Sequence, residues 1–199
     1  MTTSTSYFLY PLIAYLLGSI PFGLILSNLF GNGKLRELGS KNIGATNVLR
    51  TQGKLLGALT LLFDFSKAFL PCYFLKTDCE YTNMLILVAP AMGHMFPIWL
   101  KFKGGKGVAA YFGSLCALDI HTCLITAIIW LCVFFICRIS SIACLSSIVL
   151  SCGVFAYIRH LKHLEFFNQL CVLIILAVFI VARHHENIKR LLSDEEPKF

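Results

Sequence analysis

The sequence predicts an all-helical membrane protein with about seven transmembrane helices. Of its 199 residues, 57% are hydrophobic and only 14% are charged, and the mean hydropathy is +0.77. One soluble core could not bury so much apolar surface. The apolar residues also gather into runs, and a helix needs about 20 of them to cross a bilayer. We therefore expect one membrane domain over residues 1–199, with short connections and no separate soluble domain.

The apolar runs alternate with short polar or glycine-rich stretches. Helices are expected over residues 7–30, 55–75, 82–100, 108–118, 122–137, 141–158 and 166–182. The first run contains Gly18-Ser19-Ile20-Pro21-Phe22-Gly23, where we expect a bend or a local opening because proline cannot donate a backbone hydrogen bond. The run at 108–118 is short for a full crossing, so we expect it to be tilted, shallow or packed against its neighbours.

Basic residues are distributed unevenly between the two sides of these helices. Lys76, Arg159 and Lys162 fall on one side, whereas thirteen lysines and arginines fall on the other. The positive-inside rule places the larger set in the cytoplasm, so the N-terminus is expected outside and the C-terminus inside. Because the basic residues stand singly in short loops, the net charge of +7 fits membrane orientation and anionic small substrates better than nucleic acid.

Familiar metal, disulfide and nucleotide motifs are absent from the sequence. Most of the nine cysteines lie in apolar runs or at their ends, where cysteine behaves as a small hydrophobic residue, and no CxxC occurs. Gly107 follows Lys106 where a nucleotide P-loop has serine or threonine. No His-x4-Asp pair, GxSxG elbow or HExxH helix is found. We therefore expect no metal and no cofactor.

The glycine turn, Gly104–Gly107, joins two apolar runs. Its three glycines surround Lys106 and leave little side-chain bulk, so a phosphate could reach the backbone amides beside an ammonium group. The alternative is a tight connection between helices whose lysines mark the cytoplasmic side. His94 lies in the preceding apolar run, near the end that leads into the glycine turn. There it is either a packing residue or a group that supports the site.

The first polar loop offers small hydrogen-bonding side chains together with an arginine. Ser40, Asn42, Thr46 and Asn47 supply the small groups, and Arg50 supplies a guanidinium that could hold a phosphate through two parallel bonds. Such a loop suits a polyhydroxy phosphate. A helix start capped by serine or asparagine is the alternative interpretation.

Two further sets of polar residues stand out. If the C-terminal tail is helical, His184 and Asn187 share a face and could form one wall of a ligand site, although a solvated amphipathic tail has the same pattern. Asp64 and Lys67 lie three residues apart in the second expected helix. Two charges there would be costly in lipid unless they pair, so we expect them to pair with each other.

With these stretches taken together, the chain resembles the bacterial acyl-phosphate:glycerol-3-phosphate acyltransferases, the PlsY family, over nearly its whole length. The matching pieces are Gly18–Gly23, the loop from Gly39 to Arg50, the segment from Gly93 to Gly107, and His184…Asn187-Ile188…Arg190-Leu191. Ser141 resembles the family's serine after the fifth helix. The chain departs from the family at Asp194 and Ala68, where glycine is usual.

The resemblance implies a seven-helix protein of the bacterial inner membrane with its active site on the cytoplasmic face. It implies transfer of an acyl group from acyl phosphate to the 1-hydroxyl of glycerol 3-phosphate, the first step of phospholipid biosynthesis. The products would be lysophosphatidate and inorganic phosphate. The lipid bilayer and the enzyme that forms the acyl phosphate are the implied partners.

The resemblance also implies roles for individual residues. The residues expected to bind the acyl phosphate and the departing phosphate are Gly104, Gly105, Lys106, Gly107, Asn42, Thr46 and Asn47. Those expected to bind glycerol 3-phosphate are Ser40, Arg50, Ser141, His184 and Asn187. Those expected to act in catalysis are Lys106, His184 and Ser40, supported by His94, Asp64 and Lys67. Transfer would be direct, and either His184 or a substrate phosphate would take the hydroxyl proton.

Two other classes of protein share part of this pattern. A transporter of phosphorylated metabolites could use Lys106 and Arg50 for selectivity, but it predicts charges spread through the membrane depth. Only Asp64, Lys67 and His94 lie at such depth. A non-catalytic membrane partner of lipid-synthesis enzymes is the other alternative.

Overall fold

The computed structural model describes residues 4–199, and every regular element in this range is a helix. The chain forms two compact units, Met1–Leu118 and Asp119–Phe199, which are described separately below. The expectation of one functional domain over the whole chain stays a prediction.

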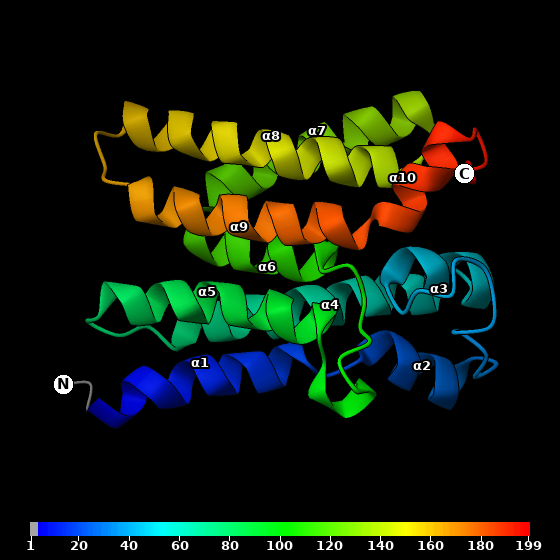
Figure 1. Cartoon of the computed structure of the whole chain (residues 1–199), viewed down its shortest axis with the longest axis horizontal. Coiled ribbons are helices and arrows are strands. Elements are labelled where there is room, and N and C mark those ends of the chain that lie inside the picture. Colours follow the sequence, from blue (N-terminus) through cyan, green and yellow to red (C-terminus); the bar gives the residue numbers. More distant parts are fainter. Residues whose placement is uncertain (1–3) are drawn as a thin grey trace. The chain divides into compact units, whose positions relative to one another are not determined.

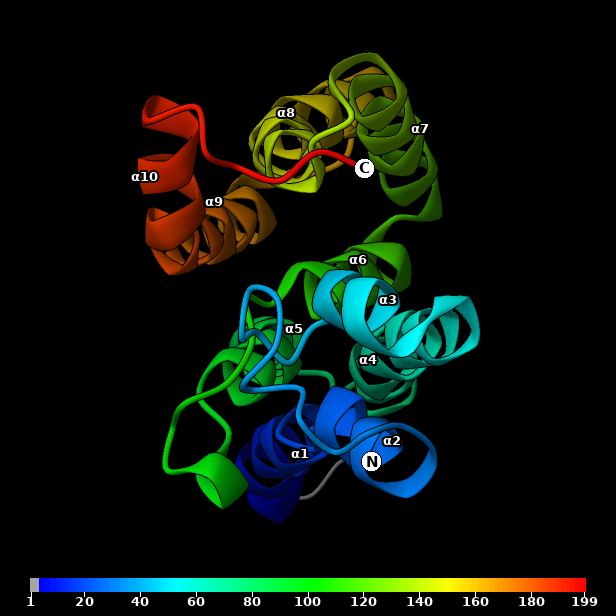
Figure 2. The same cartoon turned by 90° about the vertical axis from the view of Figure 1, so that its right-hand side faces the viewer.

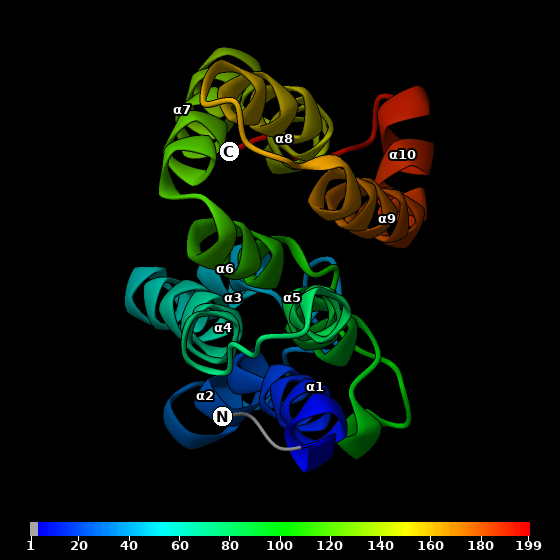
Figure 3. The same cartoon turned by 90° about the vertical axis from the view of Figure 1, so that its left-hand side faces the viewer.

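The first unit is organised around helix α4. Its elements are α1 (Ser4–Gly18), α2 (Phe22–Phe30), α3 (Ala45–Gln52), α4 (Lys54–Phe74), α5 (Glu80–Met95), the 3-10 turn η1 (Ile98–Leu100) and α6 (Val108–Leu118). Helix α4 packs against each of the other α-helices in this unit, and α1 lies alongside α5 (Figures 1 and 3). The central position of α4 explains why it can carry buried charges without exposing them to lipid.

The break expected in the first apolar run is confirmed. Helix α1 ends at Gly18 and α2 begins at Phe22, with Pro21 at the junction. The backbone of α5 lies so close to α1 that a side chain at Gly18 would collide with the backbone of Pro90, and one at Gly93 with the Tyr15 carbonyl. Small residues permit this approach, as they do between many transmembrane helices.

The departure from the family pattern at Ala68 is accommodated by close packing between α4 and α6. Ala68 is fully buried. A Cβ atom added to Gly113 on α6 would lie 3.1 Å from the Ala68 Cβ and would collide with the Phe65 carbonyl. The missing side chain at Gly113 therefore makes room for the methyl group of Ala68.

The second unit contains four helices. These are α7 (Ile120–Cys137), α8 (Ser140–Leu161), α9 (Phe167–Arg183) and α10 (His185–Leu192). Helices α7 and α8 pack side by side, and α8 also packs against α9 (Figure 2). Helix α10 bends away from α9 by 58° at His184. This bend gives the tail its own short helix.

The expected apolar runs all appear as helices, although they are not equally long. By length and apolarity, the spans that could cross a membrane are Thr5–Phe30, Lys54–Phe74, Glu80–Leu100, Ile120–Cys137 and Ser140–Leu161. The bent pair α9 and α10 passes the same test as one broken span. Helix α6 has only 11 residues, as its short apolar run predicted. The described residues thus contain five or six full-length candidates, and seven crossings stay a prediction.

Candidate active site

The first polar loop is held in shape by the buried side chain of Asn47. Its Nδ2 donates hydrogen bonds to the carbonyls of Leu35 and Leu38 (both 3.2 Å) and Asn42 (2.9 Å). Its Oδ1 accepts a hydrogen bond from the Ser40 amide at 2.9 Å. Asn47 is 2% exposed. Because these backbone groups occupy its amide, Asn47 sets the position of Ser40, and its expected contact with phosphate stays a prediction.

A short helix, α3, follows this loop and was not foreseen as a separate element. Thr46 and Arg50 lie four residues apart, so they share one face of α3. The Asn42 Oδ1 accepts a hydrogen bond from the Gly44 amide at 2.8 Å just before the helix begins. The loop therefore presents the exposed Ser40 next to a helix that carries Arg50.

The glycine turn folds back on the end of α5. The Gly105 amide donates to the His94 carbonyl at 3.0 Å, and the Gly104 amide donates to the Met95 carbonyl at 3.1 Å. Side chains at these glycines would collide with His94, whose ring lies against Gly105. Because both amides are used within the turn, an anion must bind beyond them.

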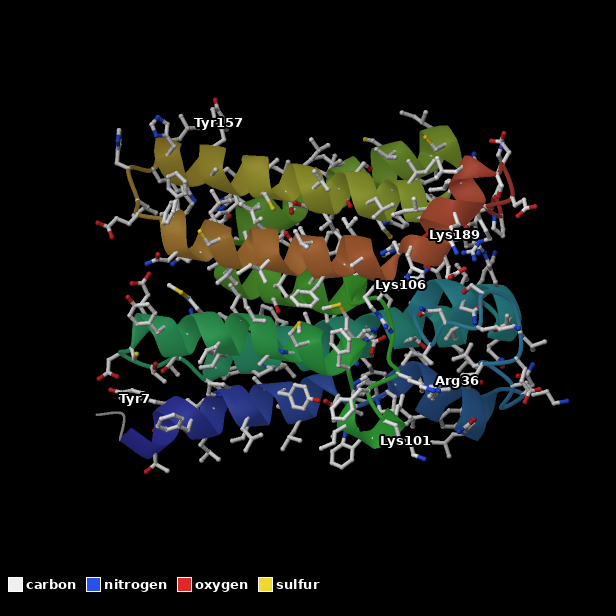
Figure 4. The ribbon with its side chains drawn as sticks, viewed as in Figure 1. Tyr7, Arg36, Lys101, Lys106, Tyr157 and Lys189 are labelled. Atoms are coloured by element: carbon white, nitrogen blue, oxygen red, sulfur yellow. The ribbon has the colours of Figure 1, made fainter. Side chains whose placement is uncertain are left out.

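The next residues provide the features that an anion needs. Gly107 has a φ of +87°, which glycine adopts without strain, and α6 begins directly after it. The first amides of a helix have no partner inside the helix, and its dipole favours negative charge at that end. Lys106 lies at this point of the first unit (Figure 4). The turn can therefore place an ammonium group beside the start of α6.

Arg36, which sequence reasoning did not single out, ties the first loop to the glycine turn. Its Nη2 donates to the Lys103 carbonyl at 2.7 Å (Figure 4). One basic residue among several in an exposed loop carries no sequence signal for such a bond. This contact brings the Ser40 loop and the Lys106 turn together within the first unit.

A buried charged cluster supports the same region. The Lys67 Nζ lies 2.7 Å from the Asp64 Oδ1, which is 3.5 Å from the His94 Nδ1. Lys67 also donates to the Ile20 carbonyl at 2.7 Å, in the break between α1 and α2. The side chains of all three residues are at most 4% exposed. The expected Asp64–Lys67 pairing is confirmed, and the cluster links the break between α1 and α2 with α4 and α5.

In the second unit, the Glu196 carboxylate accepts hydrogen bonds from residues of both α8 and α10. Its Oε1 accepts hydrogen bonds from Ser141 Oγ at 2.7 Å and Asn187 Nδ2 at 2.6 Å, and its Oε2 accepts one from Arg190 Nε at 2.7 Å. Burial raises the pKa of this carboxyl, but the three donors outweigh it and hold the pKa below the ordinary value. Glu196 is therefore a carboxylate at neutral pH.

The chain reverses sharply after α10 to bring Glu196 back. Asp194 has a φ of +57°, and the Glu195 amide donates to the Arg190 carbonyl at 2.7 Å. The left-handed backbone suits glycine, which the family resemblance led us to expect at position 194, and aspartate is one of the residues that tolerate it. Sequence reasoning missed Glu196, although an acidic residue two positions after a turn residue was the available signal.

His184 lies at the bend between α9 and α10. Its ring is buried, and its Nδ1 lies 2.7 Å from the Ile180 carbonyl. A carbonyl only accepts, so Nδ1 carries the hydrogen in this contact, and in the neutral ring Nε2 then has the lone pair. His184 therefore holds a tautomer that can accept a proton at Nε2.

Replacing Glu196 with glutamine tests this network. We expect Glu196→Gln to lower the free energy of unfolding by about 2 kcal/mol at pH 7, because a charged acceptor of three bonds is lost. The folded-state pKa lies below the ordinary 4.5, so the stabilisation is present above pH 4.5 and is lost as the pH falls through the folded value. Denaturation measured against pH should show a weaker acid dependence in this variant than in Glu195→Gln, its exposed neighbour. Equal profiles would contradict the network's role.

The helices and their buried polar clusters define a helical membrane protein with cationic and hydrogen-bonding side chains in both units. Comparison with known proteins identifies the class more closely. The family model described as Glycerol-3-phosphate acyltransferase matches residues 8–194. The chain therefore belongs to the glycerol-3-phosphate acyltransferase family, as the motifs in its sequence indicated.

Individual relatives resemble the chain along almost its whole length. The glycerol-3-phosphate acyltransferase of Pelagibacter ubique is 46% identical over 192 residues, which cover 96% of this chain and 97% of the relative. That of Caulobacter vibrioides is 45% identical over 187 residues, covering 92% and 84%. Both matches therefore cover more than nine tenths of this chain.

Two crystal structures of PlsY (YgiH), an integral membrane glycerol 3-phosphate acyltransferase, also resemble this structure. The glycerol 3-phosphate form has a TM-score of 0.89, with 34% identity over 98% of this chain and 96% of that one. The lysophosphatidic acid form has a TM-score of 0.87, with 34% identity over 98% and 95%. The prediction of a helical membrane protein of this family is confirmed.

Proposed function

We propose that this protein is a glycerol-3-phosphate 1-O-acyltransferase that uses acyl phosphate as its donor. The observation that carries the proposal is the full-length resemblance to an enzyme solved with glycerol 3-phosphate and with lysophosphatidic acid. The proposed reaction forms 1-acylglycerol 3-phosphate and inorganic phosphate. The family assignment favours this enzyme over the transporter and the non-catalytic partner.

The polar residues of both units serve this reaction in the proposal. Lys106 and the amides at the start of α6 bind the phosphate of the donor. In the first unit, Ser40 and Arg50 have the proposed role of binding glycerol 3-phosphate. In the second unit, the family resemblance implies the same role for Ser141, His184 and Asn187. Both substrates are anionic, and the cationic side chains and oriented amides named here offset their charges.

The transfer needs no acyl-enzyme, because acyl phosphate is a mixed anhydride with a good leaving group. The substrate hydroxyl oxygen attacks the carbonyl carbon and forms the new ester bond. The carbon–oxygen bond to phosphate breaks, and phosphate leaves with that electron pair. The hydroxyl proton passes to a base. Holding the two substrates together could contribute about 7–11 kcal/mol at best.

His184 is the proposed base, because the contact of its Nδ1 with the Ile180 carbonyl fixes the tautomer of the neutral ring and puts the lone pair on Nε2. We expect His184→Ala to lower kcat by about 10²-fold, the lower end of the range for general-base catalysis. Initial rates at saturating substrates measure this effect, with His185→Ala, the exposed neighbouring histidine, as the control. Near-normal turnover by His184→Ala would transfer the role of base to a phosphate of the substrate.

A direct assay tests the proposed donor. Purified protein in detergent receives glycerol 3-phosphate with acyl phosphate, acyl-CoA or an acyl-carrier-protein thioester, each alone and in competition. We expect lysophosphatidate from acyl phosphate without CoA, and no product from either thioester. Product from a thioester alone would reject acyl phosphate as the donor but would still show that the protein is an acyltransferase. No product from any donor would reject the function.

We also propose that the protein lies in the inner membrane of a bacterium with both substrate-binding regions facing the cytoplasm and its N-terminus outside. The excess of lysine and arginine on one side of the helices supports this orientation. The donor would then come from an acyl-phosphate-forming enzyme on the cytoplasmic side. A green fluorescent protein fused after Phe199 should fluoresce, and a dark fusion of full length would contradict the orientation.

A further inference from the structure

An exposed turn between α5 and the glycine turn combines apolar and basic side chains. The segment Ile98–Lys103, called the interface turn here, begins with η1 and ends one residue before Gly104. Trp99 is 61% exposed, Phe102 57% and Ile98 47%, while Lys101 and Lys103 are also exposed. Lys101 lies on the outside of this turn in Figure 4. Its outer surface therefore consists of large apolar groups beside two positive charges.

The inner side of the interface turn is anchored to the first unit. Leu100 packs against the buried cluster that includes Leu26, Leu35 and Val48. The Tyr15 hydroxyl on α1 donates to the Phe96 carbonyl at 2.7 Å, just before the turn. The turn therefore has a defined inner and outer face, and Trp99 and Phe102 belong to the outer one.

The backbone of the interface turn is unusual for exposed residues. Lys101 and Phe102 have φ values of +50° and +62°, a region that non-glycine residues enter at a cost of about 1–2 kcal/mol each. The Phe102 amide donates to the Pro97 carbonyl at 3.0 Å, which closes the turn. The exposed ring of Phe102 recovers little of this cost by packing inside the unit. Such strain at a surface commonly accompanies a binding role.

Only one environment suits both the backbone and the side chains of this turn. Irregular backbone that faces lipid does not occur in the hydrocarbon core, because its polar groups would lack partners. Bulk water, in turn, does not favour an exposed tryptophan, phenylalanine and isoleucine. The headgroup region of a bilayer accepts both, and tryptophan is enriched there.

The positive charges of the turn favour a lipid with a negatively charged headgroup. No aspartate or glutamate occurs between Phe96 and Gly107, whereas Lys101, Lys103 and Lys106 all do. Arg36 brings a guanidinium to the same region, because its Nη2 donates to the Lys103 carbonyl. We propose that the interface turn binds an anionic phospholipid, with Lys101 and Lys103 on the headgroup and Trp99 and Phe102 inserted beside its acyl chains.

This lipid site would hold the glycine turn at the depth of the headgroups. The chain passes from Lys103 directly to Gly104, which is bonded to the end of α5. The inference concerns a structural lipid and does not depend on the proposed reaction, so it can be tested without an activity assay.

Quenching of Trp99 by brominated lipids tests the proposal. The protein contains two tryptophans, so Trp130→Phe leaves Trp99 as the only one. The full chain is placed in vesicles of phosphatidylglycerol and phosphatidylcholine, with bromine on the acyl chains of one lipid at a time and equal bromine content. We expect brominated phosphatidylglycerol to quench Trp99 more strongly, corresponding to roughly tenfold enrichment beside the turn.

Paired lysine variants provide the control. Lys101→Gln with Lys103→Gln should make the two brominated lipids quench equally. Lys189→Gln with Lys198→Gln, which removes the same charge from the C-terminal tail, should preserve the preference for phosphatidylglycerol. Equal quenching in the parent Trp130→Phe protein would overturn the anionic lipid site. Quenching by neither lipid would show that Trp99 does not lie beside acyl chains, and would overturn the proposal as well.

Discussion

Lys106→Met is expected to lower kcat for acyl transfer by about 10²–10³-fold, the usual cost of removing one group that stabilises developing negative charge. The reason is structural. The amides of Gly104 and Gly105 are occupied by the carbonyls of Met95 and His94, so the departing phosphate depends on Lys106 and the start of α6. Methionine keeps most of the length of the side chain and removes its charge.

The measurement is the CoA-free assay at saturating substrates, combined with thermal unfolding in the same detergent. Lys54→Met is the matched control, because Lys54 is an exposed lysine in the same unit and lies outside the proposed site. We expect full activity from the control and unchanged unfolding temperatures for both variants. Normal turnover by Lys106→Met would remove the phosphate-binding role of this lysine.

Asp64→Asn is expected to destabilise the protein by about 3–5 kcal/mol, because it leaves the buried ammonium of Lys67 without its carboxylate. The two groups lie 2.7 Å apart inside α4, and their side chains are 3% and 2% exposed. In a membrane-spanning helix, an uncompensated charge has no water to stabilise it. His94, 3.5 Å from the same carboxylate, would lose its contact too.

The double variant Asp64→Asn with Lys67→Met separates charge pairing from simple damage. It removes both charges, so we expect it to unfold at a higher temperature than Asp64→Asn alone. The fraction of protein that stays monodisperse after heating in detergent reports this difference. A double variant no more stable than the single one would show that the pair is not energetically coupled.

Local patterns in the sequence were sufficient to predict much of the fold. The apolar runs located every long helix, because burial in lipid requires continuous apolar residues. Gly18 and Pro21 predicted the break between α1 and α2, because proline disrupts backbone hydrogen bonding. The cost of isolated charges predicted the Asp64–Lys67 pair. The family resemblance rested on motifs that could be read directly from the chain.

The tertiary structure alone decided which polar groups hold the protein together and which remain for a ligand. Asn47 looked like a phosphate ligand, but the folded loop surrounds its amide with backbone partners. Gly104 and Gly105 looked like open donors, but their amides turn back to α5. Glu196 meets Ser141 only because the chain reverses at Asp194. The residue type determines which hydrogen bonds a group can form. The path of the folded chain determines which partner lies next to it.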